Sequence, residues 1–382
     1  MATTVPIRPP DPPAVRRLGA DVVRLGADAG LAAVGIAGAD VFTDTRATLH
    51  ARRSAGLHGG MQFTYRNPDR STDPARVLAG ARSLVVGAWG YRRRDPVGDV
   101  PPTRSSAGSA GRPVGAVARY ARLDHYAALR SALGRVADRL RDDGWRAQVV
   151  VDENALVDRA AAHRAGLGWY GRNTLLLLPG LGSWFLLGSV VTDAPLVPTP
   201  AEGHAAPAEG CGPCRRCVAA CPTEALVADG VLDARRCLAW LVQATGPFPV
   251  EHRAALGGRI HGCDECQEVC PVNRAGDRRN PPTAAEHGTV AAVDLLDLLA
   301  ATDEQLLATN GRWYLAGRDP RYLRRNALVA LGNVGDGRDP ATVAALERWI
   351  DSGDELLAEH ARWAAGRLGR ADPAAAPTAA AP

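Results

Sequence analysis

The sequence predicts an α/β protein with three parts and a short tail. Helical and strand patterns alternate over residues 14–195, which is typical of an α/β domain. All eight cysteines lie within the second part, residues 196–282, and the third part, residues 283–370, has helical patterns throughout. Residues 371–382 are mainly alanine and proline, and we expect them to be disordered.

The first part is expected to bury several strands between helices. Apolar residues at helical spacing predict helices, and short apolar runs bounded by glycine or polar residues predict strands. The expected helices span residues 14–30, 124–141 and 156–165, and the expected strands span residues 31–36, 83–90, 114–120, 148–151, 174–178 and 184–192. Residues 92–115 are rich in Arg, Pro, Gly and Ser, which predicts a flexible loop or a lid.

Two segments of the third part resemble each other. Leu323 to Asn333 (LRRNALVALGN) and Leu357 to Leu368 (LAEHARWAAGRL) begin about 34 residues apart, with a further helix expected over residues 340–350. A repeat of this length predicts stacked helices of the HEAT type.

The composition narrows the class of protein. The 382 residues carry a net charge of +4, which is too small to indicate a nucleic-acid partner. Every basic residue other than histidine is arginine, so phosphate contacts would be made by guanidinium groups. No apolar run is long enough to span a membrane, and Arg16-Arg17 precedes an amphipathic helix rather than a hydrophobic segment. We therefore expect a cytoplasmic monomer without an export signal or a membrane segment.

The eight cysteines form the strongest chemical pattern. Residues 211–222 read C-x2-C-x2-C-x3-C-P, the spacing of bacterial ferredoxins, in which the fourth cysteine binds the other cluster. Residues 263–271 read C-x2-C-x3-C-P, and a lone Cys237 supplies the missing thiolate. The expected ligands of one [4Fe–4S] cluster are Cys211, Cys214, Cys217 and Cys270, and those of the other are Cys221, Cys237, Cys263 and Cys266.

Disulfide bonds and zinc sites are the alternatives for these cysteines. Disulfides are disfavoured because the expected compartment keeps thiols reduced. Zinc stays open because C-x2-C is also a zinc spacing, although zinc sites rarely combine three close cysteines with a remote Cys-Pro.

A carboxylate follows one of the expected strands. Asp152 comes directly after residues 148–151 and ahead of a helix, where α/β sheets often bind ligands. The alternative is a helix cap. Five glycines between Gly166 and Gly182 allow close approach of a ligand, or form ordinary turns. No catalytic or metal-binding role is assigned to the isolated histidines His58, His125 and His163.

A basic stretch lies in the helical part. Residues 312–325 contain five arginines and one aspartate, which could follow an RNA backbone on a solenoid face. A solvated helix face is the alternative. The candidate RNA-binding residues are Arg318, Arg324 and Arg325.

Motifs spread over residues 14–370 make the chain resemble the epoxyqueuosine reductases. The GSWFLLG run at residues 182–188, followed by this cysteine layout, is more specific than either motif alone. The other motifs that carry the resemblance are Gly60-Met61, Arg70 to Pro74, Gly80 to Leu84, Arg119 to Ala121, Asp152, Asp158-Arg159, AGLGWYGRNTLLL at 165–177 and HGCDECQEVCPVN at 261–273.

The resemblance implies a cobalamin-dependent enzyme with two [4Fe–4S] clusters. Such an enzyme reduces epoxyqueuosine to queuosine at the wobble position of tRNA with GUN anticodons, the last step of queuosine biosynthesis. The α/β part would bind cobalamin, the second part would be ferredoxin-like, and the HEAT-like helices would contact the tRNA. A low-potential donor such as ferredoxin or flavodoxin would supply electrons.

The resemblance also implies roles for residues. Asp152 would donate a proton to the epoxide oxygen, with a pKa raised by burial beside the corrin. The implied cobalamin contacts are Arg70, Ala118, Asp152, Asn173, Leu176, Leu187, Ala239 and the Cys263-Asp264 step.

The sequence departs from the family pattern twice. Asp152 is followed by Glu153-Asn154-Ala155, where the family usually has a small or hydroxyl residue and often a proline. Strand alternation is expected to turn Glu153 to the other face. Residues 122–126 read RLDHY, one residue shorter than the family pattern and with the usual order of Tyr and His exchanged.

Two other functions would also use two iron–sulfur clusters. A related cobalamin and iron–sulfur reductase, such as a reductive dehalogenase, would usually carry an export signal and lack the helical tail. A non-catalytic iron–sulfur electron carrier would not need a large domain ahead of its clusters.

Overall fold

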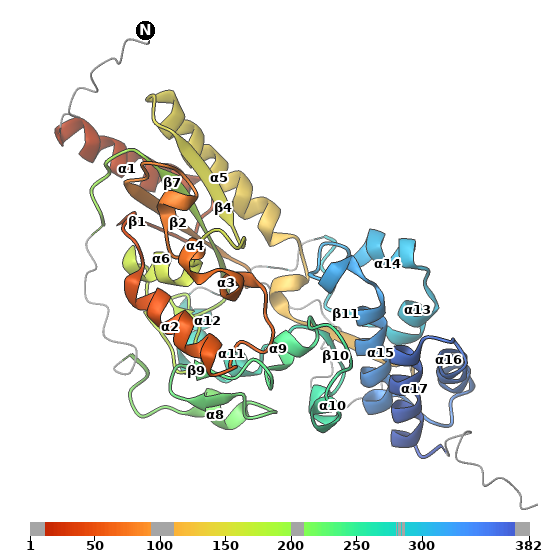
Figure 1. Cartoon of the computed structure of the whole chain (residues 1–382). Helices are drawn as coiled ribbons and strands as arrows, with labels where there is room; N and C mark the ends of the chain where they lie inside the picture. Colours follow the sequence, from red (N-terminus) through yellow and green to blue (C-terminus); the bar gives the residue numbers. More distant parts are fainter. Residues whose placement is uncertain are drawn as a thin grey trace, which may run out of the picture.

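A four-stranded antiparallel sheet forms the centre of the first part (Figure 1). The computed structural model describes residues 12–92, 111–199, 210–279, 281, 284 and 287–370. The expected tail, and most of the loop expected over residues 92–115, lie outside these ranges. In spatial order the strands are β1 (Ala33–Gly38), β2 (Ser83–Gly90), β7 (Phe185–Thr192) and β4 (Ala147–Val151).

Helices cover both faces of this sheet. On one face, α1 (Pro12–Asp28) and α5 (His125–Asp142) bury apolar side chains against Val190. On the other face, α2 (Thr43–Ser54) and α6 (Asp158–Arg164) do the same against Val191. Neighbouring strand residues point to opposite faces, and both faces are covered, which explains the nearly continuous apolar runs in the sequence.

The antiparallel arrangement corrects the sequence argument for Asp152. The rule that ligands bind at the carboxyl ends of strands applies to parallel sheets. Here β4 is an edge strand that pairs antiparallel with β7, and Asp152 follows its last residue. The surroundings of Asp152 are therefore formed by the elements packed around the end of β4, and not by the carboxyl ends of neighbouring parallel strands.

The strand expected over residues 174–178 is not part of the main sheet. Only Leu176–Leu177 (β6) is extended, and it pairs with Trp169–Tyr170 (β5) in a separate hairpin. Gly168 is required there, because a Cβ at this position would lie 2.1 Å from the carbonyl oxygen of Leu177.

A three-stranded sheet joins all three parts of the chain. β3 (Val114–Val117) lies between the parallel strand β10 (Arg259–His261) and the antiparallel strand β11 (Ala292–Asp294). Val117 and Ala121 belong to the core of the helical part. The segment around β3 therefore packs away from the first domain, although it lies within residues 14–195.

Short elements make up the cysteine-containing part and the edge of the first part. Those of the first part are α3 (Phe63–Arg66), α4 (Pro68–Ser71), η1 (Pro74–Arg76) and η2 (Arg119–Ala121). Those of the second are α8 (Arg216–Ala220), β8 (Leu226–Ala228), β9 (Val231–Leu232), α9 (Leu238–Leu241), α10 (Val250–Leu256), α11 (Glu265–Glu268) and α12 (Pro271–Arg279).

The third part is a group of packed helices. They are α13 (Leu295–Ala300), α14 (Asp303–Asn310), η3 (Ala316–Arg318), α15 (Arg321–Val334), α16 (Pro340–Ile350) and α17 (Glu355–Arg367). The two similar sequence segments form α15 and α17, which approach so closely that a Cβ on Gly332 would lie 2.8 Å from the Cα of Ala364. Their assignment to HEAT-type repeats stays a prediction. In the ranges that the structure describes, no helix combines the length and apolarity needed to cross a bilayer.

Candidate active site and iron–sulfur ligands

The Asp152 loop is held by one face of α5. Asp152 is exposed and has a left-handed backbone (φ +48°), a conformation that aspartate adopts more readily than most residues. Arg130 Nη2 donates to the carbonyl oxygen of Val151 at 3.2 Å, and it lies 3.9 Å from the carboxylate of Glu153. Tyr126, one helical turn before Arg130, hydrogen-bonds to the Asp152 side chain. The chain bends after Val151, so strand alternation does not orient Glu153.

One buried tyrosine, Tyr91, and two partly buried ones, Tyr120 and Tyr126, extend from this loop towards Asp264. Burial is the largest cause that raises the pKa of Tyr91, Tyr120 and Tyr126. The charge of Asp264 adds to the rise for Tyr91 and Tyr120, and the charge of Asp152 adds to it for Tyr120 and Tyr126. These phenols stay protonated at neutral pH and can donate hydrogen bonds. Sequence reasoning missed them, although the exchanged His-Tyr order at residues 125–126 was a signal for Tyr126.

Asp264 lies beside Ala118 although they are distant in sequence. Asp264 Oδ2 accepts a hydrogen bond from the Arg119 N–H at 2.7 Å, and the Ala118 N–H donates to the His261 carbonyl at 2.9 Å. A Cβ on Gly262 would lie 2.4 Å from that of Ala118, so only glycine fits between them. Burial raises the pKa of Asp264 more than the Arg119 N–H lowers it. Two of the implied cobalamin contacts, Ala118 and the Cys263-Asp264 step, thus come together.

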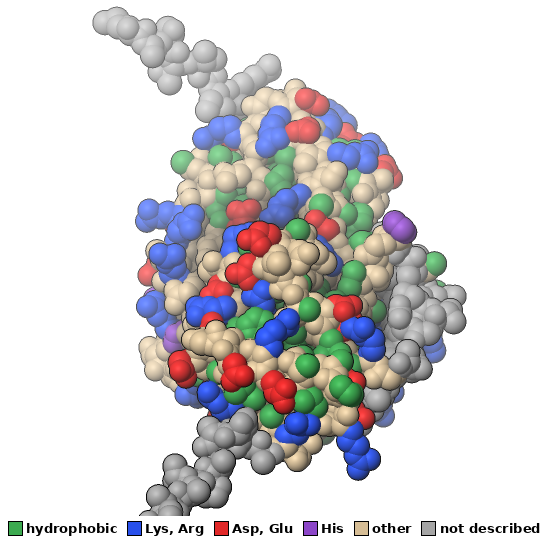
Figure 2. All heavy atoms as spheres, turned by 90° about the vertical axis from the view of Figure 1, so that its right-hand side faces the viewer, with side chains coloured by type: hydrophobic (Ala, Val, Ile, Leu, Met, Phe, Trp, Pro, Cys, Tyr) green, Lys and Arg blue, Asp and Glu red, His purple; other side chains and the backbone are tan. Residues whose placement is uncertain are grey.

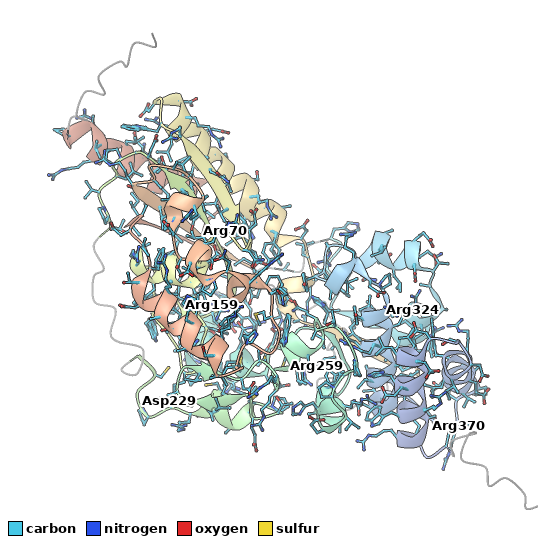
Figure 3. The ribbon with its side chains drawn as sticks, in the orientation of Figure 1. Arg70, Arg159, Asp229, Arg259, Arg324 and Arg370 are labelled. Carbon is cyan, nitrogen blue, oxygen red and sulfur yellow. The ribbon has the colours of Figure 1, made fainter. Side chains whose placement is uncertain are left out.

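Asn173 and Ala239 border the same region, whereas three further implied cobalamin contacts lie elsewhere in the first part. Asn173 Nδ2 donates to the Cys266 carbonyl at 3.4 Å. The Ala239 carbonyl accepts a hydrogen bond from Gln243, whose Nε2 also lies 3.5 Å from the Tyr120 hydroxyl. Leu176 and Leu187 belong to the apolar cluster on the α6 side of the sheet. Arg70 is exposed on α4, within the first domain (Figure 3).

The glycines between Gly166 and Gly182 fit the packing of the chain on itself. A Cβ on Gly182 (φ +75°) would lie 2.0 Å from Asn273 Oδ1, and that same oxygen accepts the Ser183 N–H at 2.7 Å. Asn273 belongs to α12 of the second part. Gly182, like Gly168, therefore allows two chain segments to meet, which is neither close approach of a ligand nor an ordinary turn.

Most electrostatic interactions among the cysteines fall within the two expected sets, whose assignment as cluster ligands stays a prediction. In the first set, Cys217 interacts electrostatically with Cys211 and Cys270, and Cys270 does so with Cys211 and Cys214. In the second set, Cys237 interacts with Cys221, Cys263 with Cys237, and Cys266 with both Cys237 and Cys263. Burial is the largest cause that raises the pKa of five of these thiols, those of Cys217, Cys237, Cys263, Cys266 and Cys270. Within the described ranges, no three His, Cys, Asp or Glu side chains could hold a single metal ion.

The prediction that Arg324 and Arg325 contact RNA is wrong. Arg325 is fully buried and donates to the carbonyl oxygens of Leu241, Ala244 and Gly246 at 2.6–2.9 Å. Burial lowers the pKa of Arg325 to about 10. Arg324 is 6% exposed, pairs with Asp303 and donates to the Ala301 carbonyl. Both arginines fasten α15 to neighbouring segments, because the basic stretch enters the interior where the helix begins.

Arg318 is exposed, as an RNA contact would have to be. Nearby in the sequence, Tyr314 is 41% exposed, and its ring centroid lies 4.8 Å from that of Phe63 on α3. Sequence reasoning missed this aromatic pair because its members are distant in the chain. Figure 2 looks onto the molecule from the side of the helical part, where acidic and basic side chains are interspersed.

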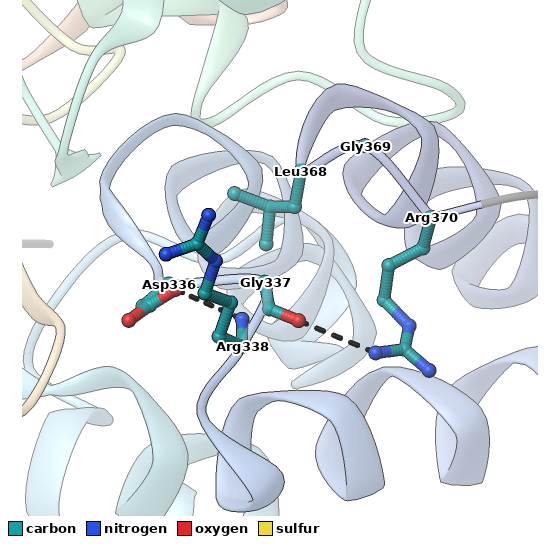
Figure 4. A pocket seen from close by; sticks show the side chains of 6 residues that line it. All are labelled: Asp336, Gly337, Arg338, Leu368, Gly369 and Arg370. Carbon is teal, nitrogen blue, oxygen red and sulfur yellow. Dashed lines mark hydrogen bonds between the residues drawn. The ribbon is translucent and has the colours of Figure 1, made fainter.

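A polar pocket of about 610 Å³ lies at the end of the helical part (Figure 4). It is lined by Asp336, Gly337, Arg338, Leu368, Gly369 and Arg370. Arg370 Nη1 donates to the Gly337 carbonyl at 3.2 Å across it. No residue of the candidate active site lines this pocket.

Residues 210–273 match a family model described as a 4Fe-4S double cluster binding domain. This range contains all eight cysteines. The match supports iron–sulfur clusters over the zinc alternative.

Similarity to known proteins extends over nearly the whole chain. An epoxyqueuosine reductase of Xanthomonas campestris pv. campestris is 34% identical over 353 residues, which cover 90% of this chain and 94% of that protein. A crystal structure of an epoxyqueuosine reductase with an epoxyqueuosine-modified tRNA-Tyr stem loop superposes with a TM-score of 0.81 at 30% identity, covering 94% of this chain and 92% of that one. The Bacillus subtilis enzyme, solved with its catalytic aspartate loop swung out of the active site, is 28% identical, with a TM-score of 0.81 and coverages of 94% and 92%. The chain belongs to the epoxyqueuosine reductase family.

Proposed function

We propose that this enzyme reduces epoxyqueuosine to queuosine in tRNA, the last step of queuosine biosynthesis. The observation that carries the proposal is the joint presence of Asp152, the three tyrosines and two cysteine sets in a chain of this family. Conversion of an epoxide to an alkene consumes two electrons and two protons, and it releases the oxygen as water. The site must therefore deliver electrons from one side and protons from the other.

Asp152 is the proposed proton donor. Its exposed carboxyl group can reach a bound substrate, and the Tyr126 hydroxyl orients it. Protonated Asp152 gives its proton to the epoxide oxygen as the carbon–oxygen bond breaks. Glu153 lies 3.9 Å from the guanidinium group of Arg130 instead, so Asp152 is the proposed acid of the loop.

The two [4Fe–4S] clusters would be held by the two cysteine sets. The thiolate donors fit iron–sulfur ligation. An electrostatic interaction between Cys217 of one set and Cys266 of the other indicates that the two sets are neighbours. The set of Cys221, Cys237, Cys263 and Cys266 is the one next to Asp264, and so to the tyrosines that lead to Asp152.

Cobalamin is the proposed partner of the residues between this set and Asp152. Asp158 Oδ1 and His58 Nδ1 are buried without a hydrogen-bond partner among the described residues, and a Cβ on Gly60 would meet nothing within 4 Å. A corrin carries amide groups around its rim, which suit such polar atoms. Bound cobalamin would supply the strongly reducing centre that opens the epoxide. Its proposed contacts are Arg70, Ala118, Asp152, Asn173, Leu176, Leu187, Ala239 and Asp264.

Arg318 and Tyr314 are the proposed RNA contacts on the helical side. The guanidinium group can pair with a phosphate, and an exposed tyrosine can stack on an unpaired base. A low-potential ferredoxin or flavodoxin is the proposed electron source.

The test is anaerobic incubation of the cluster-loaded protein with cobalamin, a reductant and tRNA carrying epoxyqueuosine, followed by nucleoside analysis. We expect queuosine to appear only when cobalamin is present. Absence of queuosine from protein with full iron content and bound cobalamin would contradict the proposal.

A substitution of Cys237 tests its proposed role as a cluster ligand. We expect Cys237→Ser to lose about half of the bound iron and all turnover, since one of the two sets loses a ligand. Retention of the wild-type iron content would remove Cys237 from the ligand set.

A further inference from the structure

The two cysteine sets differ in their surroundings. Gly212, Pro213, Arg215 and Arg216, which surround Cys214 of the first set, are exposed. By contrast, His261, Gly262 and Gln267, which flank Cys263 and Cys266 of the second set, are buried. The loop of Cys211, Cys214 and Cys217 therefore lies at the protein surface, although Cys270 of the same set is buried. The second set lies nearer Asp264 and the reacting side.

A hairpin is fastened onto the exposed cysteine loop. Arg172, mostly buried, donates to the carbonyl oxygens of Gly212 and Cys214 and to the carboxylate of Asp229 at 2.8 Å. Asp229, in the turn between β8 and β9, also pairs with Arg215 at 2.9 Å. The loop and the hairpin thus form one surface, even though 15 residues separate Cys214 from Asp229.

This surface combines an exposed apolar side chain with positive charge. Val227 on β8 is 47% exposed, and Arg215 is 58% exposed. Exposed arginine side chains outnumber exposed carboxylates here. The arginines are Arg215, Arg216, Arg235 and Arg236, and the carboxylates are Glu224 and Asp229. Figure 3 places Asp229 at the end of the molecule opposite Arg324 and Arg370 of the helical part.

We propose that the surface formed by Arg215, Arg216, Val227 and Arg236 is the docking site for a small acidic electron-carrier protein. The proposal rests on the iron–sulfur function proposed above, and it assigns the cluster of Cys211, Cys214, Cys217 and Cys270 as the entry point for electrons. Transient electron-transfer complexes bury little area, so an apolar contact within a charged rim is sufficient. Opposite charges on the carrier would speed its association and make the rate depend on salt.

The test compares protein and small-molecule reductants with the charge-reversal variant Arg215→Glu/Arg216→Glu. The rate of cluster bleaching is measured by stopped flow with photoreduced flavodoxin, with reduced ferredoxin and with dithionite. We expect the variant to react at least tenfold more slowly with the acidic proteins at low salt, with little remaining salt dependence. Bleaching by dithionite should change less than twofold. The control Arg24→Glu/Arg141→Glu reverses two exposed arginines on α1 and α5, each of which pairs with an aspartate, and should react like the wild type.

Two results would overturn the proposal. One is an unchanged rate with both carrier proteins at wild-type iron content. The other is weakened tRNA binding with unchanged reduction, which would assign the surface to RNA. If Arg216→Glu lowers the iron content, the variant Arg215→Ala/Val227→Asp replaces it, because both of its positions lie outside α8, the helix that contains Cys217. This variant should also react more slowly with the acidic carrier proteins and not with dithionite. Failure of the epoxyqueuosine reaction itself remains distinguishable, because bleaching of the clusters does not require the substrate.

Discussion

The contact between α15 and the second part, and the Asp152 loop at the end of β4, both depend on polar side chains, but in opposite ways. Arg325 and Asn326 are buried, and their side chains together contact five carbonyl oxygens, those of Leu241, Val242, Ala244, Gly246 and Ile260. The Asp152 loop is exposed, and its contacts to α5 come from the side chains of Tyr126 and Arg130.

The difference shows how stability and activity are divided in this chain. The side chains of Arg325 and Asn326 are shielded from water, so losing one of their hydrogen bonds leaves an unsatisfied polar group. The loop contacts are partly solvated and weak, which lets the acid adjust to a large substrate. Substitutions at the buried contact should therefore affect folding, and substitutions in the loop should affect catalysis.

Asp152→Asn should give the largest loss of activity, and it tests most directly whether the exposed loop affects catalysis and not folding. We expect kcat to fall by about 10³-fold because a general acid is lost, while the unfolding transition and iron content stay unchanged. The measurement is single-turnover conversion of epoxyqueuosine in tRNA. Glu153→Gln is the matched control, and it should keep kcat within a few-fold. A larger loss in Glu153→Gln than in Asp152→Asn would exchange their roles.

Arg325→Met tests the buried side of the comparison. The side chain loses its bonds to three carbonyl oxygens, so we expect the free energy of unfolding to fall by about 3–5 kcal/mol. Urea unfolding followed by tryptophan fluorescence provides the measurement. Arg321→Met, at the exposed start of the same helix, should change stability by less than about 1 kcal/mol. Equal effects of the two substitutions would mean that the buried contact contributes no special stability.

The sequence predicted local patterns well and long-range contacts poorly. The strand over residues 83–90 and the cysteine spacing depend on near neighbours, and both were recognisable in the chain. The exclusion of β3 from the first domain depends on β10 and β11, about 143–180 positions further along the chain, which no local pattern encodes. The burial of Arg324 and Arg325 was missed for the same reason, because charge alone does not reveal that carbonyl oxygens replace water around a guanidinium group.

His360 on α17 makes another buried contact between the helical part and the second part sensitive to pH. Its Nε2 accepts the Phe248 N–H at 3.0 Å and its Nδ1 lies 2.6 Å from the Leu356 carbonyl, so the neutral ring fits both partners. Burial lowers the pKa of His360 to about 4, so the unfolded state binds the extra proton between about pH 6.5 and 4. Stability should be complete above pH 6.5 and fall by at most about 3 kcal/mol as the pH drops to 4. The check is urea unfolding across this range, in which His360→Gln should show a shallower pH dependence than the wild type.

Tyr126→Phe and Arg130→Ala test the contacts of the exposed Asp152 loop, and they should have the smallest effects on kcat. Each removes a contact between α5 and the Asp152 loop and leaves the acid in place, so we expect kcat to fall about 3–10-fold, equivalent to about 1 kcal/mol. A structural role alone would leave the pH profile unchanged. If Tyr126 orients the carboxyl group, its loss should also shift the pH dependence of kcat, whereas Arg130→Ala should lower kcat without that shift. Identical pH profiles for Tyr126→Phe and the wild type would reduce Tyr126 to a packing residue, and the loop would then be held by Arg130 and its own backbone.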